Sequence, residues 1–306
     1  DRLDRCRVDP DRGGSVNAAL TLRERSEAEA SRLPPLLARA EHLAGTVLLG
    51  DHGRRRSGMG DDFWQYRPAQ IGDSRRMIDH RRSARGDQQF VREREWQIAQ
   101  SVMLWVDQGA SMRFASDKTL PTKADRARLL GLATSILLVR GGERVGLTGT
   151  TLPPRRGNAQ IIRLAQAWSE DDQADYAPPE HRAMIPHARA VFISDFLGPM
   201  DEVELALTKA ADRGVRGVVL QVLDPGEESF PYRGRTIFES VGGSVRHETL
   251  KAAELRDRYL ERLARRKDAL TQLCRATGWQ LGLHHTGDSA QAALLWLYRA
   301  LDGGTR

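Results

Sequence analysis

Two aspartates follow apolar runs that are typical of buried strands. Asp107 ends the run SVMLWVD, and Asp195 ends the run AVFISD. If these two strands are neighbours in a parallel sheet, their carboxyl ends meet at one edge, and both carboxylates face a common crevice together with the Ser111 hydroxyl. Hard oxygen donors of this kind suit Mg²⁺. The alternative is that each aspartate only caps the turn or helix that follows its strand.

Other catalytic arrangements lack their usual residues. The sequence contains no Gly-x-Ser-x-Gly, no Gly-x-x-x-x-Gly-Lys-Ser/Thr and no Gly-x-Gly-x-x-Gly, the usual carriers of hydrolase, nucleoside triphosphatase and dinucleotide chemistry. A metal-dependent phosphoesterase that uses Asp107 and Asp195 stays open as an alternative. An arrangement of the haloacid dehalogenase type would need a carboxylate at position 109, where Gly109 stands. We therefore expect no enzyme and assign no catalytic residue.

A regular alternation of strands and helices starts near residue 97. Strands are predicted at 101–107, 144–149, 188–195, 215–224 and 279–286, and helices at 123–139, 158–168, 200–213, 250–277 and 288–301. The strands are apolar throughout, which is typical of strands buried on both faces of a parallel sheet. We predict an α/β domain over residues 97–306, with a doubly wound, mostly parallel sheet.

The segment before this domain is predicted in two parts. Residues 1–20 are charged and rich in Asp, Arg and Gly, which indicates a disordered tail. Residues 21–96 begin with a helical pattern that Pro34 and Pro35 interrupt, so that a second helix would start there. The runs DFWQYR, MIDHRRSA and QQFVREREWQ then alternate apolar and polar residues, as half-buried strands do. We predict a helical and β-containing N-terminal extension with an Arg-rich connector.

Residues 54–94 contain eleven arginines against six acidic residues. One interpretation is a surface for nucleic acid or phosphate, on which Phe63, Trp64 and Tyr66 stack with bases. The other is a structural strap, in which guanidinium and carboxylate groups pair within the chain. The members of this strap are Arg67, Asp73, Arg75, Asp79 and Arg85. Because acids and bases are interleaved, the sequence favours the strap, and we expect no nucleic-acid partner.

Composition limits the cellular setting more than the function. The net charge of +6 and the isoelectric point near 9.7 would suit an anionic partner, but an Arg-rich composition also follows from GC-rich coding. Cys6 and Cys274 stand alone, which indicates neither a disulfide framework nor a zinc site. No stretch reaches the roughly 20 apolar residues of a membrane span, and the first residues lack the apolar core of a signal peptide. We expect a cytoplasmic protein without a membrane span.

The loop Asp107-x-Gly109-x-Ser111 resembles the metal-ion-dependent adhesion site of von Willebrand factor A domains, which reads Asp-x-Ser-x-Ser. In that family the serines and a threonine from a second loop bind the metal directly, while the aspartates act mainly through water. Gly109 lacks the hydroxyl, and the loop GTTLPPRRGNAQ offers no threonine at the matching place. The resemblance implies a degenerate site of Asp107, Gly109, Ser111 and Asp195 that binds Mg²⁺ weakly or not at all, so no cofactor is expected.

The stretch from residue 62 to 85 resembles the signature of domain-of-unknown-function family 58 (DUF58). Its matching residues are Tyr66, Arg67, Gly72, Asp73, Arg75, Ile78, Asp79, Ser83, Ala84 and Arg85. Further matches follow in the right order, at Val145-Gly146-Leu147, Ile193-Ser194-Asp195-Phe196, Leu223-Asp224-Pro225-x-Glu227 and Phe230-Pro231. The resemblance covers about residues 50–300. It implies that the α/β domain is von Willebrand factor A-like, a Rossmann-like arrangement that follows the N-terminal extension.

This resemblance implies a non-enzymatic protein-interaction or adaptor module. Proteins of this kind are commonly paired with MoxR-type AAA+ ATPases in the assembly or maturation of other complexes, so such an ATPase is the expected partner. The expected contact surface is the carboxyl edge of the sheet. Its residues are Gln108, Ser111, Met112, Ser194, Asp195 and Phe196.

The strap interpretation generates a stability prediction. Replacing Asp79 with Ala removes one carboxylate from the proposed pairs, so the midpoint of thermal unfolding should fall. Thermal denaturation followed by circular dichroism measures this midpoint. An unchanged midpoint would show that the segment is a solvated binding face instead.

Overall fold

A computed structural model describes most of the chain. The described residues are 35–47, 64–69, 78, 80–84, 88, 90–94, 100–169, 174–232, 236–239, 246–249 and 252–302. The chain divides into two compact units, one of residues 50–100 and one of residues 1–49 together with 101–306. The predicted tail at residues 1–20 lies outside the described residues.

The larger unit is built on a five-stranded sheet in which every strand is parallel to its neighbours. In spatial order the strands are β4 (Arg144–Leu147), β3 (Ser101–Val106), β5 (Arg189–Ser194), β6 (Arg216–Leu223) and β9 (Gln280–His285). The inner strands β3, β5 and β6 are buried over almost their whole length, as their unbroken apolar runs predict. The predicted α/β fold with a mostly parallel sheet is confirmed.

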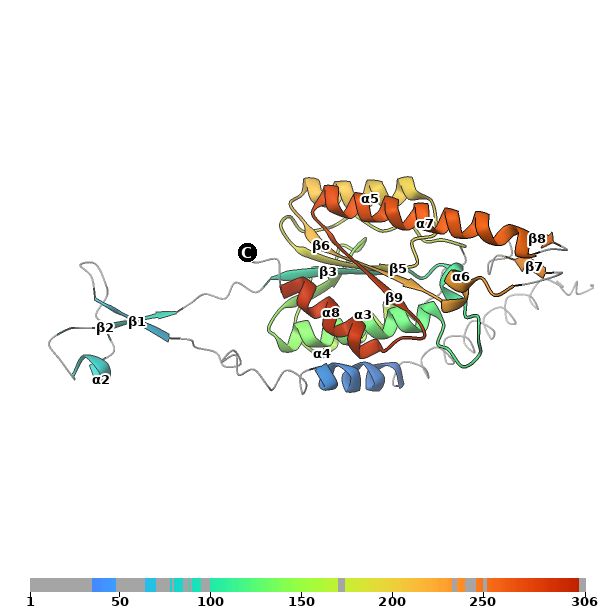
Figure 1. Ribbon diagram of the computed structural model, residues 1–306. Helices are drawn as coiled ribbons and strands as arrows, with labels where there is room; N and C mark the ends of the chain where they lie inside the picture. The colour runs from blue at the N-terminus through green and yellow to red at the C-terminus, as the bar shows by residue number, and fades with distance from the viewer. Residues whose placement is uncertain are drawn as a thin grey trace, which may run out of the picture. The chain divides into compact units, whose positions relative to one another are not determined.

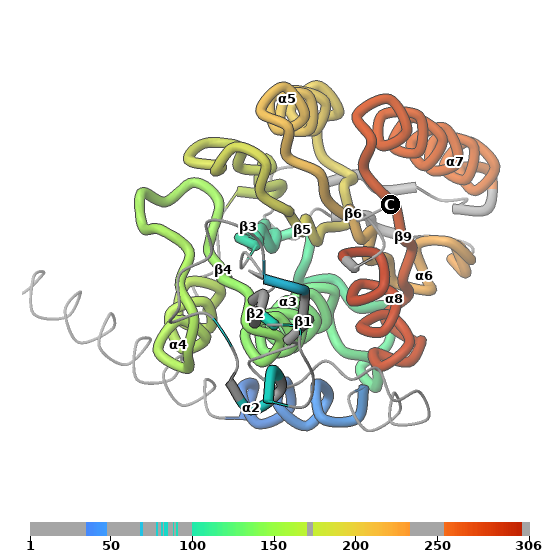
Figure 2. The backbone as a smooth tube through the Cα atoms, turned by 90° about the vertical axis from the view of Figure 1, so that its left-hand side faces the viewer, coloured from blue at the N-terminus to red at the C-terminus, as the bar shows by residue number. Residues whose placement is uncertain are grey.

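Helices cover both faces of this sheet (Figure 1). On one face lie α3 (Lys123–Arg140), α4 (Asn158–Ala167), α8 (Ala290–Asp302) and a helix at residues 35–47; on the other lie α5 (Met200–Asp212) and α7 (Ala252–Thr277). Figure 2 shows the same layers from another side, with the helix at residues 35–47 outermost. The sheet has one hydrophobic core on each face, and successive residues of a strand point into opposite cores. Along β3, Leu104 packs into the core under α3 and α8, and Trp105 packs into the core under α5 and α7.

The order of the strands creates a switch point between β3 and β5. From β3 the chain moves outward to β4, then returns to the other side of β3 and continues through β5, β6 and β9. Val106 and Ile193 are register partners, and the Asp107 backbone N–H donates to the Ile193 carbonyl at 2.9 Å. The two strands that end at the aspartates are therefore neighbours. In open α/β sheets, ligands bind outside the carboxyl ends of strands at such a point.

The smaller unit contains an antiparallel pair, β1 (Trp64–Pro68) and β2 (Phe90–Arg94), which confirms the β-containing extension. The sequence predicted a strand at MIDHRRSA. This prediction is wrong for His80–Ser83, which form the short helix α2. Alternation over so few residues does not distinguish a strand from one helical turn. Of the strap residues, Arg67 lies in β1, whereas Asp73, Arg75, Asp79 and Arg85 lie outside the described residues.

Several short elements had no clear signal in the sequence. They are the 3₁₀ helix η4 (Ala110–Arg113), the helix α6 (Pro225–Ser229) and the antiparallel pair β7 (Thr236–Glu239) and β8 (Arg246–Thr249). Elements η4 and α6 follow β3 and β6 directly, so both lie at the carboxyl edge of the sheet. Within the described ranges, no helix is both long and apolar enough to cross a membrane.

Candidate functional site

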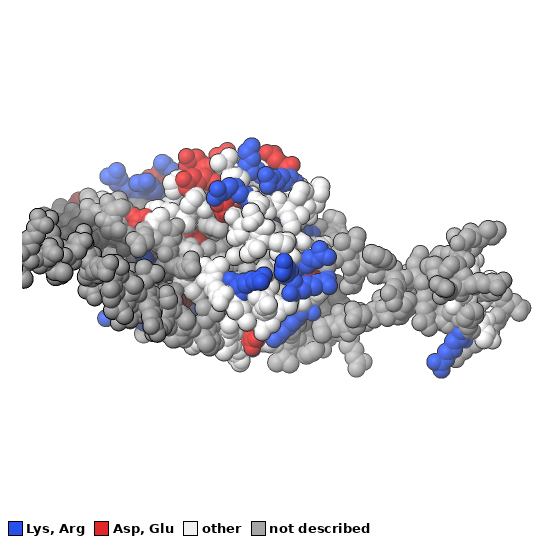
Figure 3. Space-filling model, turned by 180° about the vertical axis from the view of Figure 1, so that it is seen from behind, with Lys and Arg blue, Asp and Glu red and all other residues white. Residues whose placement is uncertain are grey.

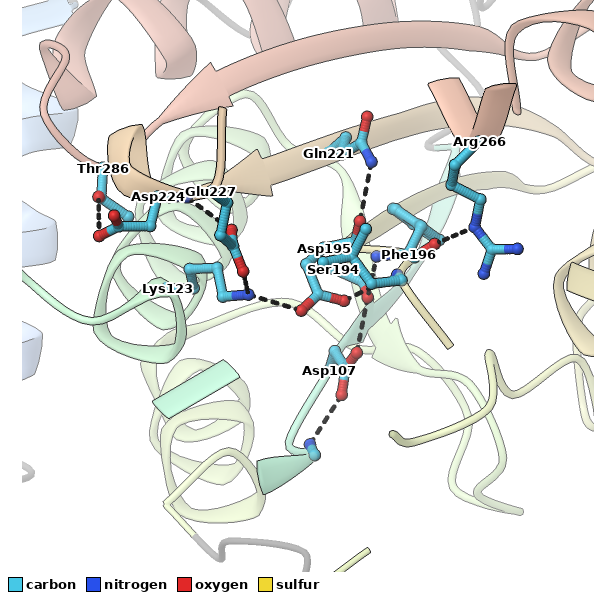
Figure 4. Close-up of polar contacts among 12 residues, drawn as sticks. Asp107, Lys123, Ser194, Asp195, Phe196, Gln221, Asp224, Glu227, Arg266 and Thr286 are labelled. Carbon is cyan, nitrogen blue, oxygen red and sulfur yellow. Dashed lines mark hydrogen bonds and ion pairs between the residues drawn. The ribbon is translucent and has the colours of Figure 1, made fainter. Parts of the chain in front are cut away.

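Buried acidic residues gather at the carboxyl edge of the sheet (Figure 4). Asp107, Asp195 and Asp224 directly follow the neighbouring strands β3, β5 and β6, and each is at most 2% exposed. Buried carboxylates are costly unless donors surround them, so the contacts of each one reveal its role.

Asp107 holds the turns that follow β3 and β5. Its Oδ1 accepts a hydrogen bond from the Gly109 backbone N–H at 2.7 Å, and its Oδ2 accepts one from the Ser194 hydroxyl at 2.6 Å. The Ser194 oxygen in turn accepts from the Phe196 backbone N–H at 2.9 Å. Both carboxylate oxygens of Asp107 are therefore engaged within the protein.

Gly109 is required by the close approach of another segment. A Cβ at this position would lie 2.8 Å from the Ala177 backbone nitrogen and 3.0 Å from both the Asp175 carbonyl and Asp107 Oδ1. The Ser111 backbone N–H donates to that same Asp175 carbonyl at 2.9 Å. The serine expected from the adhesion-site pattern would push these two segments apart. Packing explains the departure from the pattern.

Lys123, which the sequence analysis did not single out, lies at the centre of the edge. Its Nζ is 2.7 Å from Asp195 Oδ2 and 2.5 Å from Glu227 Oε1, and its side chain is 1% exposed. Lys123 is also the first residue of α3, where the positive end of the helix dipole disfavours a cation. The two carboxylates provide the compensation that this position needs.

Glu227 connects Lys123 to the turn after β6. Its Oε2 accepts from the Asp224 backbone N–H at 2.9 Å, and Asp224 Oδ1 accepts from the Gly226 N–H at 2.7 Å. This reciprocal pair is a capping box at the start of α6, with Pro225 at the first helical position. Asp224 Oδ2 also accepts from the Ser116 N–H at 3.1 Å, which ties the loop before α3 to the same turn.

The turn after β5 is held from three sides. Asp195 Oδ1 accepts from the Leu197 N–H at 3.0 Å, and the Asp195 carbonyl accepts from the Gln221 side chain at 2.8 Å. Phe196 has a φ of 52°, in the left-handed region that non-glycine residues rarely adopt. The Arg266 guanidinium donates to the Phe196 carbonyl at 2.6 Å and supports this conformation.

The charges at the edge do not balance. Asp107, Asp195 and Glu227 are three carboxyl groups near one ammonium. Burial raises the pKa of Asp107 to about 7, and the nearby Asp195 charge adds to the effect. Burial alone would lower the pKa of Lys123, but the Asp195 and Glu227 charges outweigh it and raise that pKa above its ordinary value. Lys123 thus stays charged, and Asp107 holds a proton over part of the neutral range.

The described residues do not fit the divalent metal ion that the adhesion-type resemblance implies. The ammonium of Lys123 lies between the two carboxylates that would otherwise be free to ligate an ion. Asp107 accepts from two internal donors, and Gly109 has no side-chain oxygen. Among the described residues, no group of three or more His, Cys, Asp or Glu side chains is arranged to hold a metal ion. The Ser111 hydroxyl oxygen is buried without a hydrogen-bond partner.

The residues expected to bind a partner lie mostly beneath the surface. Met112, Ser194, Asp195 and Phe196 are buried, while Gln108 and Ser111 are half-buried. Gln108 is also held by Arg128, whose guanidinium donates to the Gln108 side-chain Oε1 at 2.8 Å. A partner-binding role therefore stays a prediction, in which most of these residues would act by holding the loops.

Exposed apolar side chains do occur on the neighbouring loops. Leu152 is 58% exposed in the loop after β4, and Tyr176 is 42% exposed in the segment that covers Gly109. These loops touch, because the Gly149 N–H donates to the Arg182 carbonyl at 3.0 Å. Tyr176 also lines a hollow whose wall includes Asp107 and Ser194. We refer to Leu152 and Tyr176 with their two loops as the rim.

Sequence reasoning missed Lys123, Glu227, Gln221 and Arg266 as parts of this site. Glu227 belongs to the motif Leu223-Asp224-Pro225-x-Glu227, but its contact with Lys123 spans 104 residues. Lys123 did carry one local signal: a lysine at the start of a helix lies at the positive end of the helix dipole, which disfavours a cation. Gln221 and Arg266 carried no such signal.

Comparison with known proteins gives one family match. The sequence model of the family described as "Protein of unknown function DUF58" matches residues 65–269, more than half of the chain. No curated protein matches. A solved structure, described as the conserved hypothetical protein BatB from Bacteroides thetaiotaomicron, is 16% identical over 67% of this chain and 100% of its own, with a TM-score of 0.38. That degree of similarity adds nothing to the fold described above.

The raised pKa of Asp107 predicts how stability depends on pH. The unfolded chain loses the Asp107 proton near pH 4, whereas the folded protein keeps it to about pH 7. The free energy of unfolding of the wild type, relative to Asp107→Asn, should therefore fall as the pH rises from about 4 to about 7, by up to about 4 kcal/mol. Urea unfolding of both proteins across this range measures the difference.

A control of opposite sign is available at Asp117. This exposed carboxyl has its pKa lowered by hydrogen bonds from Thr119, so its contribution to stability should be lost as the pH falls. If the difference between wild type and Asp107→Asn did not change between about pH 4 and 8, Asp107 would not titrate as described.

Proposed function

The chain belongs to the DUF58 family, and from this premise we propose that it is a non-enzymatic protein-binding module. In this proposal the α/β domain is von Willebrand factor A-like and its carboxyl edge is a degenerate adhesion site. The module works as an adaptor with a MoxR-type AAA+ ATPase in the assembly or maturation of other protein complexes. In this proposal the protein works in the cytoplasm, as the sequence predicts.

The observation that carries this proposal is the engagement of the carboxylates at the edge. Both oxygens of Asp107 and both of Asp195 accept from donors of the same chain, at 2.6 to 3.0 Å. A general base or nucleophile needs an oxygen within reach of a substrate. These groups instead fix loops, which supports a binding surface on a rigid scaffold.

The rim provides the apolar part of such a surface. Leu152 and Tyr176 are exposed on two loops that are hydrogen-bonded to each other. Single exposed apolar residues are common, but aromatic residues such as tyrosine are enriched at protein interfaces. Gly198 packs closely against Tyr176: a Cβ at position 198 would lie 2.8 Å from the Tyr176 Cβ.

Neither alternative from the sequence is favoured by an observation on the described residues. A phosphoesterase would use Asp107 and Asp195, but Lys123 and Ser194 donate to these carboxylates. A nucleic-acid surface would use residues 54–94, many of which lie outside the described ranges. On the face in Figure 3, acidic and basic side chains are mixed over helix α5, with further basic groups below them. The described part of this face therefore carries charges of both signs.

The binding proposal is tested with a purified MoxR-type ATPase from the same organism. We expect saturable binding by biolayer interferometry, and a loss of about tenfold or more for Leu152→Glu or Tyr176→Glu, because each places a charge on the rim. Leu205→Glu is the matched control. Leu205 is 49% exposed on α5, so this variant should bind as the wild type does.

Thermal unfolding of all three variants checks that they stay folded, since each substitution is at an exposed position. Absence of saturable binding by the wild type would contradict the proposed partner. Equal binding by the rim variants and the Leu205→Glu control would contradict the proposed surface.

A further inference from the structure

We propose that the Lys123 ammonium takes the place of a divalent metal ion between Asp195 and Glu227. The carboxyl edge is then ordered without metal, and substitution of Lys123 by a small residue exposes a latent divalent-cation site. This inference rests on the contacts of Lys123 and holds whether or not the edge binds a protein.

The Lys123 ammonium lies in a buried position between two carboxylates. Two carboxylate oxygens from different loops approach Nζ at 2.7 and 2.5 Å, and the side chain is almost completely excluded from solvent. The ring of Phe114 lies on another side, with its centroid 5.7 Å from Nζ. Figure 4 shows Lys123 reaching from α3 to the point between the two carboxylates. A compact ammonium on a flexible stem can fill such a position as a point charge.

The charge of the surroundings requires a cation at this point. Asp107 follows β3, Asp195 follows β5, and Glu227 lies in α6, which follows β6. Negative charges on neighbouring carboxyl groups repel each other. Lys123 supplies the one positive charge that directly contacts the carboxylates of Asp195 and Glu227. If the ammonium is removed, the edge must take up protons, rearrange or bind another cation.

The oxygens left behind suit a hard divalent ion. Asp195 Oδ2 and Glu227 Oε1 would lose their shared partner, since both now bind Lys123. The Ser111 hydroxyl oxygen, in the loop after β3 at this same edge, is buried without a hydrogen-bond partner. Carboxylate and hydroxyl oxygens, completed by water, are ligands of Mg²⁺ and Mn²⁺.

The test compares the wild type with variants at Lys123 in the presence of EDTA or Mn²⁺. Lys123→Ala and Lys123→Ser remove the charge and open space, whereas Lys123→Met removes the charge but keeps the bulk. Lys118→Ala is the matched control, because Lys118 is an exposed lysine in the loop before α3. Mn²⁺ binding is followed by electron paramagnetic resonance, and stability by thermal unfolding.

We expect the wild type and Lys118→Ala to bind no Mn²⁺ saturably and to unfold at the same temperature in both conditions. Lys123→Ala or Lys123→Ser should be less stable in EDTA, bind one Mn²⁺ per chain, and regain several degrees of the lost unfolding temperature. Lys123→Met should be destabilised without recovery, because its side chain still fills the position.

Two results would overturn the proposal. One is saturable one-to-one Mn²⁺ binding by the wild type. The other is failure of both Lys123→Ala and Lys123→Ser to gain stability from Mn²⁺, which includes the case in which neither folds when Mn²⁺ is supplied during expression. No ATPase is present in this experiment, so its outcome is independent of the partner-binding test.

Discussion

The carboxyl edge of this protein depends on one buried ammonium. Lys123 joins the start of α3 to Asp195, 72 residues away, and to Glu227, 104 residues away. Removing one partner of a buried charge pair usually costs about 3 to 5 kcal/mol, because the other charge is left buried without compensation. One side chain therefore contacts three segments at the carboxyl edge: the start of α3, the turn after β5 and the helix α6.

The rest of the edge is arranged around that contact. The strand order places β3 and β5 side by side, so Asp107 reaches Ser194 and the two turns share hydrogen bonds. The capping box at α6 orients Glu227 toward Lys123. Each turn that follows an inner strand thus has its carboxylate satisfied by the same chain. A scaffold fixed in this way can present the exposed loops of the rim with little loss of conformational entropy on binding.

Local pattern predicted the architecture well, because its causes are local. Apolar runs such as SVMLWVD are continuous where the sheet is covered on both faces, so strands and helices could be placed to within a few residues. The prediction failed for a short segment: His80–Ser83 is one helical turn and not a strand. The adjacency of Asp107 and Asp195 required an assumption about strand order, which the sheet shows to be correct.

The centre of the site could not be predicted in the same way. The role of Lys123 depends on contacts across more than 70 residues, which no local pattern records. The need for Gly109 likewise comes from the backbone of Asp175 and Ala177, which packs against it. Phe196 adopts a left-handed conformation, and hydrogen bonds to Ser194 and from Arg266 support its backbone on both sides. Tertiary contacts decide these features.

A double-mutant cycle between Lys123 and Asp195 measures the central interaction most directly. Urea unfolding of the wild type, Lys123→Met, Asp195→Asn and the double variant gives the coupling free energy of the pair. We expect each single substitution to destabilise the protein strongly and the double variant to be far less affected than their sum, with a coupling of about 2 kcal/mol or more. Additive effects, with a coupling near zero, would contradict the account.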